Sequence, residues 1–503
     1  MSQPPTPGPK SPSGEATGPG PQAAPPGQAS HDPAIPQALR EFMVTGWAPE
    51  GVVATPGGEV PQPDPIAPYC ARRRQALSER FPGDALVIPT GTLTVRANDT
   101  DYPFRPGSDF FWLTGEHEPD AVLVLRPEGD GHAATLFVPP RSDRSSLAFY
   151  TDRRYGELWV GPRRGVEGTA QALGIVTRPL DELAAELTTL TEVGDKTRVL
   201  RGRDARVESP IDSDEAHDAE LAEVLSELRL IKDEFEVAAL KDAVAATIRG
   251  FADVVRELPR AIETSERWIE GTFDRRARVE GNDVGYGSIC AAGAHATVLH
   301  WVRNDGPVRP GDLMLLDMGV EANSLYTADI TRTLPISGRW TPIQRLLYEA
   351  VLEAHRAALA AVQPGADFLA PHRAAMEVLA RFLESEGILP VPAEQSLRPD
   401  SGLHRRYTLH GVSHMLGLDV HDCAAARNEF YREGTLQPGM VLTVEPGLYF
   451  QVDDETVPPQ FRGIGIRIED DVLVTESGSR VLSAALPIDP DEIEAWMAEL
   501  LQR

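Results

Sequence analysis

The sequence predicts a mixed α/β (α+β) fold of two domains behind a polar tail, and three observations support this prediction. The chain has 503 residues, whereas a typical domain has about 150. Short apolar runs bounded by Pro, Gly and Asp alternate with longer stretches of helical periodicity. The hydrophobic content is 41% and the charged content is 25%, which is typical of globular chains with a large core.

The first 36 residues are predicted to form a disordered tail. Pro, Gly, Ser, Ala and Gln dominate residues 1–36, so this segment has little apolar surface to offset the entropy of ordering. A smaller α/β domain is expected over residues 37–225, and a charged stretch at residues 208–223 marks its end. Within it, strands are expected at residues 85–88, 121–125 and 134–138, and a helix is expected at residues 180–189.

A larger domain is expected over residues 226–503, where helices and strands alternate. A long helix is indicated by apolar residues that recur at helical spacing over residues 237–255. A second helix is predicted to have Thr341 as its N-cap and Pro342 at its first position, and to stop at residues 364–365. Strands are expected at residues 313–318, 440–445 and 463–474.

Charge and cysteine content argue against several classes of function. Lys and Arg number 48 and Asp and Glu number 76, and the net charge of −28 disfavours nucleic acid and anionic membranes as partners. No apolar stretch approaches the roughly 18 residues that span a bilayer, and no signal-peptide pattern is found. Three cysteines are too few for a disulfide framework. We therefore expect a soluble, cytoplasmic protein.

Several carboxylates interrupt apolar segments, where they have no stabilising reason to be. Asp317 ends an apolar run, and Glu445 closes another run before Pro446. Burial of an unpaired carboxylate costs several kcal/mol, so each of these side chains needs a cation. Asp329 follows Asp317 by twelve residues, and the polar segment at residues 321–324 predicts a hairpin that brings the two together.

Two further segments add an imidazole and another carboxylate. His414 lies in a segment that also contains His410 and His421. In the last predicted strand, the period of two places Arg467 and Glu469 side by side, on the face opposite three isoleucines.

Four carboxylates and one imidazole form an oxygen-rich set of ligands. Their four negative charges balance two divalent ions, which predicts a dinuclear site with a bridging hydroxide. We expect two Mn²⁺ ions, with Co²⁺ or Zn²⁺ as alternatives. Taken singly, each residue also has a structural interpretation, since a lone Asp in a strand is more often a cap or part of a salt bridge than a metal ligand. The spacing of His410 and His414 is weak evidence, since the Glu of the His-Glu-x-x-His motif is absent.

Taken together, the ordered residues and their flanking motifs are specific. The chain resembles the metal-dependent pita-bread peptidases, and among them the Xaa-Pro aminopeptidases (aminopeptidase P). The similarity extends from about residue 60 to the end, and Ser108-Asp-Phe-Phe-Trp-Leu-Thr-Gly resembles the N-terminal domain of this family. The motifs of the larger domain lie at residues 299–301, 316–319, 328–333, 410–422, 438–449 and 462–471.

The resemblance implies a pita-bread catalytic domain over residues 226–503, preceded by an aminopeptidase P type N-terminal domain. It implies that Asp329 and Glu469 bridge the two metals, that Asp317 binds one of them, and that His414 and Glu445 bind the other.

The resemblance also implies roles for residues around the metals. Arg467 and Tyr449 would hold the ligands in orientation. His300, His410 and His421 would line the substrate site, where His300 and His421 would hydrogen-bond the scissile carbonyl or its tetrahedral intermediate. These three histidines are alternatively structural.

The expected reaction is hydrolysis of the bond between an N-terminal residue and a following proline. The shared hydroxide attacks the carbonyl before proline, Glu445 is a candidate to transfer the proton, and an apolar pocket accepts the proline ring. The family has Trp directly after Ser-Asp-Phe, but this chain has Phe111 and then Trp112. Which of the two covers the substrate is left open, as is whether a neighbouring subunit supplies such a cover.

Two other functions fit parts of the same pattern. An Xaa-Pro dipeptidase (prolidase) shares the fold and all five ligands, whereas a non-catalytic pita-bread binding protein is expected to have lost ligands. Ser413, before the ligand histidine, favours the aminopeptidase over the dipeptidase. The expected partners are peptides with proline in second position, together with further copies of the chain in a homo-oligomer (dimer or tetramer).

Overall fold

The computed structural model describes residues 34–48, 62–98, 100–193 and 196–502. Apart from residues 34–36, the predicted tail lies outside the described residues. The chain divides into two compact units. The smaller unit comprises Met1–Glu59, Leu93–Phe104 and Arg141–Arg163, and the larger comprises Val60–Thr92, Arg105–Pro140 and Arg164–Arg503.

Among its described residues, the smaller unit contains only short helices and strands. These are α1 (Gln37–Met43), β2 (Val95–Ala97), β3 (Thr100–Asp101), α4 (Ala148–Thr151) and α5 (Glu157–Val160). The Tyr150 hydroxyl donates a hydrogen bond to the carbonyl of Met43 at 2.5 Å and thereby joins α4 to the end of α1.

The larger unit begins with a five-stranded mixed sheet of order β6-β5-β4-β1-β7. Its strands are β1 (Asp84–Pro89), β4 (Val122–Glu128), β5 (Gly131–Val138), β6 (Val176–Pro179) and β7 (Lys196–Val199). The surrounding helices are α2 (Ala67–Arg80), α3 (Ser108–Thr114), α6 (Gly165–Leu173), η1 (Leu180–Glu182), α7 (Leu183–Val193), α8 (Ala205–Glu208) and α9 (Glu215–Arg229).

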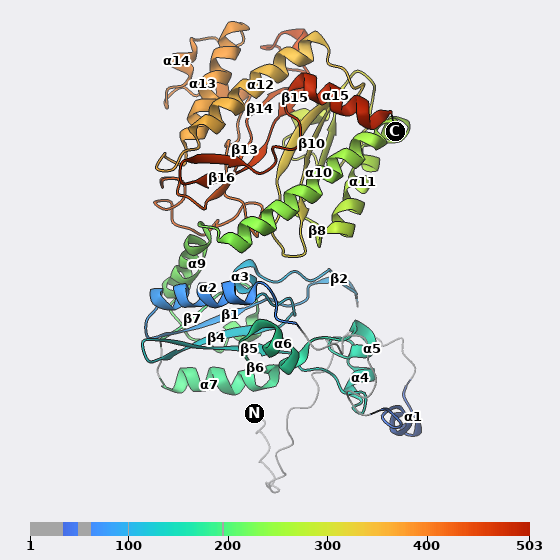
Figure 1. The fold of residues 1–503 in the computed structure, drawn as a ribbon, viewed down its shortest axis with the longest axis vertical. Helices are drawn as coiled ribbons and strands as arrows, with labels where there is room; N and C mark the ends of the chain where they lie inside the picture. The colour runs from blue at the N-terminus through green and yellow to red at the C-terminus, as the bar shows by residue number, and fades with distance from the viewer. Residues whose placement is uncertain (1–33, 49–61, 99, 194–195, 503) are drawn as a thin grey trace, which may run out of the picture. The chain divides into compact units, whose positions relative to one another are not determined.

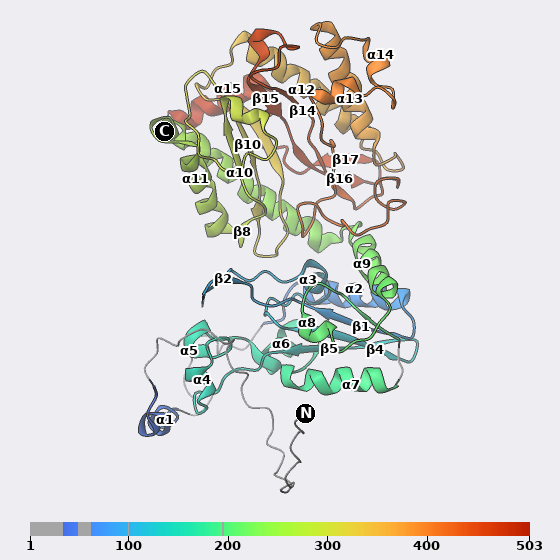
Figure 2. The ribbon, with the colours of Figure 1, turned by 180° about the vertical axis from the view of Figure 1, so that it is seen from behind.

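Alternating apolar side chains allow helices to cover both faces of this sheet. Leu86 and Ile88 belong to the same core cluster as Leu77 of α2, whereas Val87 packs in a cluster with Leu187 of α7. Figures 1 and 2 show α2 and α7 on opposite sides of the strands. The expected strands at residues 85–88, 121–125 and 134–138 and the helix at 180–189 are confirmed, and their ends differ by at most four residues from those of the structure.

The remainder of the larger unit combines long helices with short strands. The helices are α10 (Glu234–Glu263), α11 (Glu266–Glu280), η2 (Gly293–Thr297), α12 (Pro342–Ala361), α13 (Ala370–Ser385), α14 (Ala393–Ser396), η3 (Leu403–Arg406), η4 (Pro459–Phe461) and α15 (Pro490–Leu501). The strands are β8 (Asp283–Val284), β9 (Ile289–Ala292), β10 (Leu313–Met318), β11 (Val320–Glu321), β12 (Ile330–Pro335), β13 (Val441–Val444), β14 (Gly447–Phe450), β15 (Ile464–Arg467), β16 (Asp470–Thr475) and β17 (Gly478–Val481).

Local sequence explains where the two principal helices begin. The Asp233 side chain accepts a hydrogen bond from the Glu236 backbone, and the Glu236 side chain accepts one from Asp233, which forms a capping box at the start of α10. Thr341 and Gln344 form the same box at α12, with Pro342 at the first helical position as predicted. The apolar faces of both helices contribute to one core cluster with β10, β13, β15 and β16.

One sequence prediction about this region is wrong. A single strand was expected over residues 463–474, but the structure has β15 paired with β14 and β16 paired with β13, with Ile468 and Glu469 between them. The backbone changes partner at this point, since Ile468 N–H donates to Pro446 and Glu469 N–H donates to Thr331. Alternation of side chains cannot reveal such an exchange of partners between sheets.

The predicted boundary between residues 225 and 226 falls within α9 and stays a prediction. Among the described residues, every helix is too short or too polar to cross a lipid bilayer.

Candidate metal centre

Nine of the residues that the sequence indicates for the site line a single cavity of about 780 Å³, whereas Tyr449 is not among its lining residues. Five are the expected ligands, three are histidines and one is an arginine, namely Asp317, Asp329, His414, Glu445, Glu469, His300, His410, His421 and Arg467. They come from strands and loops that are widely separated in sequence.

The hairpin predicted between Asp317 and Asp329 is present. Strands β10 and β12 are antiparallel, and Met318 pairs with Ile330 in their register. Asp317 is therefore the second-last residue of β10, and Asp329 lies directly before β12. The connection between them contains β11 (Val320–Glu321) and then the expected turn, which lies at residues 323–324 and is closed by an antiparallel bridge between Glu321 and Thr327.

His414 and Glu445 are brought together by a second backbone pairing. The Glu445 N–H donates to the Val412 carbonyl at 2.8 Å, and the Thr443 N–H donates to the His414 carbonyl at 2.9 Å. These bonds align the end of β13 and the residue that follows it with the segment around His414. As a result, His414 Nε2 lies 3.4 Å from Glu445 Oε1.

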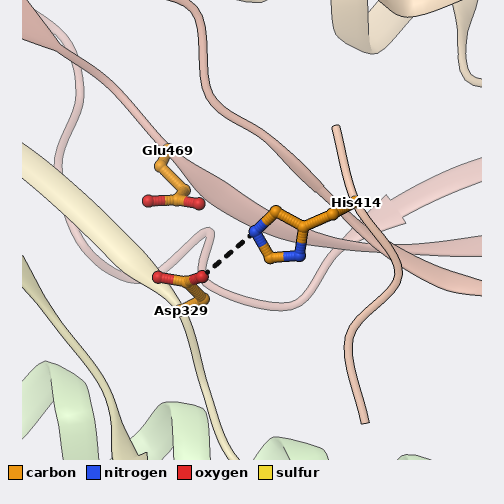
Figure 3. Close-up of side chains that lie close together, drawn as sticks. All are labelled: Asp329, His414 and Glu469. Atoms are coloured by element: carbon orange, nitrogen blue, oxygen red, sulfur yellow. Dashed lines mark ion pairs between the residues drawn. The ribbon is translucent and has the colours of Figure 1, made fainter. Parts of the chain in front are cut away.

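Asp329, His414 and Glu469 form the centre of the cluster, as Figure 3 shows. One ligand atom from each lies within 4.8 Å of the others. His414 Nε2 is 3.3 Å from Asp329 Oδ2. Glu469 reaches this position because it lies at the break between β15 and β16, and its carboxylate accepts a hydrogen bond from Thr331 Oγ1 at 2.6 Å.

Three carboxylates that line the cavity, those of Glu445, Asp317 and Glu469, have raised pKa values and hold protons more tightly than ordinary carboxylates. Burial raises the pKa of Glu445 to about 7, and the charges of Asp329 and Asp317 add to the rise. Burial also raises the pKa of Asp317, although Arg467 opposes the shift. The pKa of Glu469 is raised well above its ordinary value by burial and by Asp329 and Glu445. This cluster therefore needs additional positive charge to be fully ionised at neutral pH.

The chain supplies only part of that positive charge. Burial by itself would lower the pKa of His414, but the interaction with Asp329 and the charge of Glu445 raise it to about 9. Arg467 donates to Asp317 Oδ2 at 2.5 Å and to the Tyr449 hydroxyl at 2.9 Å. The remaining negative charge and the oxygen-rich donor set fit divalent cations that prefer oxygen and imidazole ligands.

His410 is held in one neutral tautomer. Its Nδ1 lies 2.7 Å from the Gly411 carbonyl, so this nitrogen carries the proton and donates it. Its Nε2 lies 2.8 Å from the Tyr449 hydroxyl, which donates to it. Burial and the charge of Arg467 lower the pKa of His410 to about 4. Both nitrogens are thus engaged by the protein, and His410 is a neutral wall of the cavity.

His300 and His421 differ from His410 in this respect. Both line the cavity, yet within the described part of the chain no hydrogen bond engages their ring nitrogens. The His421 ring packs edge-on against His414, with ring centroids 4.4 Å apart. Burial and the neighbouring His414 lower the pKa of His421. These two imidazoles are therefore available to a bound molecule.

Sequence reasoning missed Tyr286. Its hydroxyl lies 2.7 Å from Asp317 Oδ1 and 2.6 Å from Asp329 Oδ1, so one proton is shared between two ligand carboxylates. The only local signal is its position between Gly285 and Gly287. Gly285 is required because an added Cβ would lie 1.8 Å from Thr327 Oγ1. Such a pattern marks close packing but does not indicate what the tyrosine contacts.

Phe111 and Trp112 of α3 do not line the cavity of their own chain, and a cover supplied by a neighbouring subunit stays a prediction. Phe111 and Trp112 are 2% and 3% exposed and belong to the core cluster around α2 and α3. The Trp112 indole N–H donates to Glu236, and neither side chain lines the cavity. In this chain they are core residues.

Comparison with known proteins identifies related sequences over nearly the whole chain. Residues 238–476 match the profile of metallopeptidase family M24, and residues 70–200 match the aminopeptidase P N-terminal domain. The chain is 55% identical to Xaa-Pro aminopeptidase 1 of Streptomyces coelicolor over 472 residues, which cover 93% of each chain. It is 34% identical to the Xaa-Pro aminopeptidase of Escherichia coli, with 85% of this chain and 96% of that protein covered.

Solved structures show the same relationship. Aminopeptidase P from E. coli with the inhibitor Pro-Leu matches with a TM-score of 0.77 at 32% identity, covering 88% of this chain and 100% of that one. Zn-substituted E. coli aminopeptidase P in complex with product matches with a TM-score of 0.76 at 32% identity, covering 87% and 99%. These matches confirm the predicted fold class, an α/β N-terminal domain followed by a pita-bread domain.

Proposed function

The chain belongs to metallopeptidase family M24, within the Xaa-Pro aminopeptidases, and we propose that it removes the N-terminal residue from peptides with proline in second position. The observation that carries this proposal is the carboxylate and imidazole cluster on the wall of one cavity. Apolar side chains line the same cavity and can accept a proline ring, among them Ile289, Leu299, Val302 and Val420.

We assign the metal-binding residues as the sequence implied. Asp329 and Glu469 would bridge two ions, Asp317 would bind one of them, and His414 and Glu445 would bind the other. Divalent ions bound there supply Lewis acidity, which polarises the carbonyl before proline and makes water nucleophilic near neutral pH. Tyr286 and Arg467 orient Asp317 from two sides, because each donates to a different carboxylate oxygen.

The other residues act on the substrate and on protons. Glu445 is the candidate to accept a proton and to pass it to the proline nitrogen, since its carboxylate faces the cavity beside His410 and His414. His300 and His421 would hydrogen-bond the carbonyl oxygen as charge develops on it. The bond before proline has no N–H group, so recognition rests on the shape of the apolar wall.

Several finer points belong to the same proposal. We propose Mn²⁺ as the native metal, with Co²⁺ or Zn²⁺ as alternatives, because hard oxygen ligands dominate the site. A cytoplasmic location agrees with three buried, unpaired cysteines. A homo-oligomer is supported by exposed apolar side chains in the smaller unit, which include Leu39, Phe42, Trp47, Leu158, Trp159 and Val160.

A peptide length series tests the activity. We expect the specificity constant with Mn²⁺ to be higher for Xaa-Pro-Xaa and Xaa-Pro-Xaa-Xaa than for the dipeptide Xaa-Pro. Matched peptides with alanine in second position serve as the control and should not be cleaved. A maximum at the dipeptide would identify a prolidase instead, and metal-loaded protein that binds these peptides without cleaving any would identify a binding protein.

A further inference from the structure

A second cavity of about 720 Å³ adjoins the active-site cavity. It lies between α13, the segment around η3 and the loop at residues 409–413. Figure 2 shows α13 beside α14 near the top of the view. His410, Gly411, Ser413 and Arg432 line both cavities. The two spaces therefore share a wall, and this wall includes residues directly before the ligand His414.

The second cavity is rich in basic side chains although the chain has a net charge of −28. Its one acidic lining residue, Glu377, is paired with Arg381 on the next turn of α13. The basic lining residues are Arg373, Arg398, Arg405, Arg432, His372 and His404. Such a local excess of positive charge favours anionic groups.

Part of this positive charge has no acidic partner. Arg373 pairs with Asp367 at 2.8 Å, and Arg398 pairs with Asp400 at 3.2 Å. In contrast, neither Arg405 nor Arg432 forms an ion pair with any residue that the structure describes. Both guanidinium groups are therefore available to a ligand.

His372, which lines the second cavity, also indicates a site for an anionic ligand. Its Nδ1 is buried and has no hydrogen-bond partner in the described chain, which is costly unless a ligand or water satisfies it. Burial lowers the pKa of His372, and the positive charges of His404, Arg405 and Arg373 lower it further. The side chain thus experiences a positive potential that an anion would relieve.

The substrate geometry suggests which anion is relevant. An aminopeptidase holds the first residue of the peptide at the metal cluster, so the chain after proline must leave the active-site cavity. We propose that this chain passes His410 and Arg432 into the second cavity, which binds a carboxylate located after proline. The carboxylate is either an acidic side chain or a free C-terminus. This inference rests on the proposed function and adds a preference for acidic peptides.

A set of matched peptides tests the preference. The reference peptide is Ala-Pro-Ala-Ala-Ala with an amidated C-terminus, and its variants carry a free C-terminus, or Asp or Lys at the third, fourth or fifth position. We expect the best carboxylate-bearing peptide to have a specificity constant about 5–10-fold above the reference, and the Lys peptides to fall below it. The difference should shrink in high salt. Comparison of the free C-terminus with Asp distinguishes the two sources of the carboxylate.

A substitution in the cavity links the preference to this site. Arg405→Gln should lower the ratio of specificity constants for acidic and amidated peptides about threefold or more, through KM rather than kcat, and Arg405→Lys should restore it. Arg480→Gln is the matched control, since Arg480 is exposed on β17, does not line the cavity and forms no ion pair among the described residues.

Two results would overturn the inference while leaving the proposed function intact. One is equal cleavage of acidic, amidated and Lys peptides. The other is an acidic preference that Arg405→Gln and Arg480→Gln change equally. If none of the peptides is cleaved by the metal-loaded protein, the proposed function itself fails.

Discussion

Two clusters of buried charges in this chain are built on opposite principles. The carboxylate cluster consists of the four metal-ligand candidates Asp317, Asp329, Glu445 and Glu469. The ion-pair cluster consists of Arg229, Lys232, Asp109 and Asp422, and both clusters contact the segment that carries His414 and His421. In the ion-pair cluster Arg229 is 2.8 Å from Asp109 and also pairs with Asp422, and Lys232 is 2.9 Å from Asp422.

The pKa shifts of the two clusters run in opposite directions. Burial alone would raise the pKa of Asp422, but Arg229 and Lys232 outweigh burial and lower it. In the carboxylate cluster, burial and neighbouring carboxylates raise the pKa of Glu445 and Glu469. The chain therefore provides its own counter-charges where a cluster holds the fold together, and it leaves them incomplete where a cation from solution is to bind.

The largest expected effect comes from removing a bridging carboxylate. Asp329→Ala or Glu469→Ala should lower turnover by at least about 10³-fold with metal present, because charge stabilisation at the reacting centre is lost. The fold should survive, since relief of repulsion offsets the lost contacts. Activity assays with metal analysis measure this, and Glu476→Ala, at an exposed turn, is the control. Near wild-type turnover in either variant would contradict the dinuclear assignment.

The next effect concerns the ion-pair cluster and should appear in stability. Lys232→Met should lower the free energy of unfolding by roughly 3–5 kcal/mol, because Asp422 is left buried with incomplete compensation. Urea denaturation measures the loss, and Lys241→Met on the exposed face of α10 is the matched control. The double variant Lys232→Met with Asp422→Asn should recover part of the stability. A urea midpoint equal to that of the control would show that Lys232 is not needed as a counter-charge.

The smallest expected effect is a dependence of stability on pH, which arises from the carboxylate cluster. Without metal, the folded-state pKa of Glu445 is raised from 4.5 to about 7, so the folded state binds more protons than the unfolded state between these values. The stability that the raised pKa of Glu445 contributes to the metal-free protein is fully present below pH 4.5 and is lost as the pH rises through 7. A chelator should therefore lower the melting temperature more at pH 8 than at pH 5. An equal decrease at both pH values would contradict the proposed role of the cation.

Much of the secondary structure could be predicted from local sequence. The capping box at Thr341, the apolar stripe of α10 and the short apolar runs of β1, β4 and β5 depend on neighbours within a few residues. The strand break before Asp470 could not be predicted, because it depends on two different sheets that take up β15 and β16.

For the candidate site, too, some features could be predicted from the sequence and others could not. The sequence by itself determined which side chains are chemically unusual, since a carboxylate in an apolar strand is costly wherever the strand lies. The order of Asp317, Asp329, His414, Glu445 and Glu469 with their motifs then sufficed to indicate a metallopeptidase. This information came from the resemblance of the motifs to those of the pita-bread peptidases, which needs no knowledge of distances.

Only the tertiary structure decided how these groups meet and what supports them. The Tyr286 hydroxyl contacts both Asp317 and Asp329, although no motif marks this residue. Both ring nitrogens of His410 are hydrogen-bonded within the protein, whereas those of His421 are available to a bound molecule. Phe111 and Trp112 are buried in the core, although their sequence position suggested a substrate cover. Hydrogen bonds and burial depend on contacts between residues far apart in the chain, and a linear pattern does not contain them.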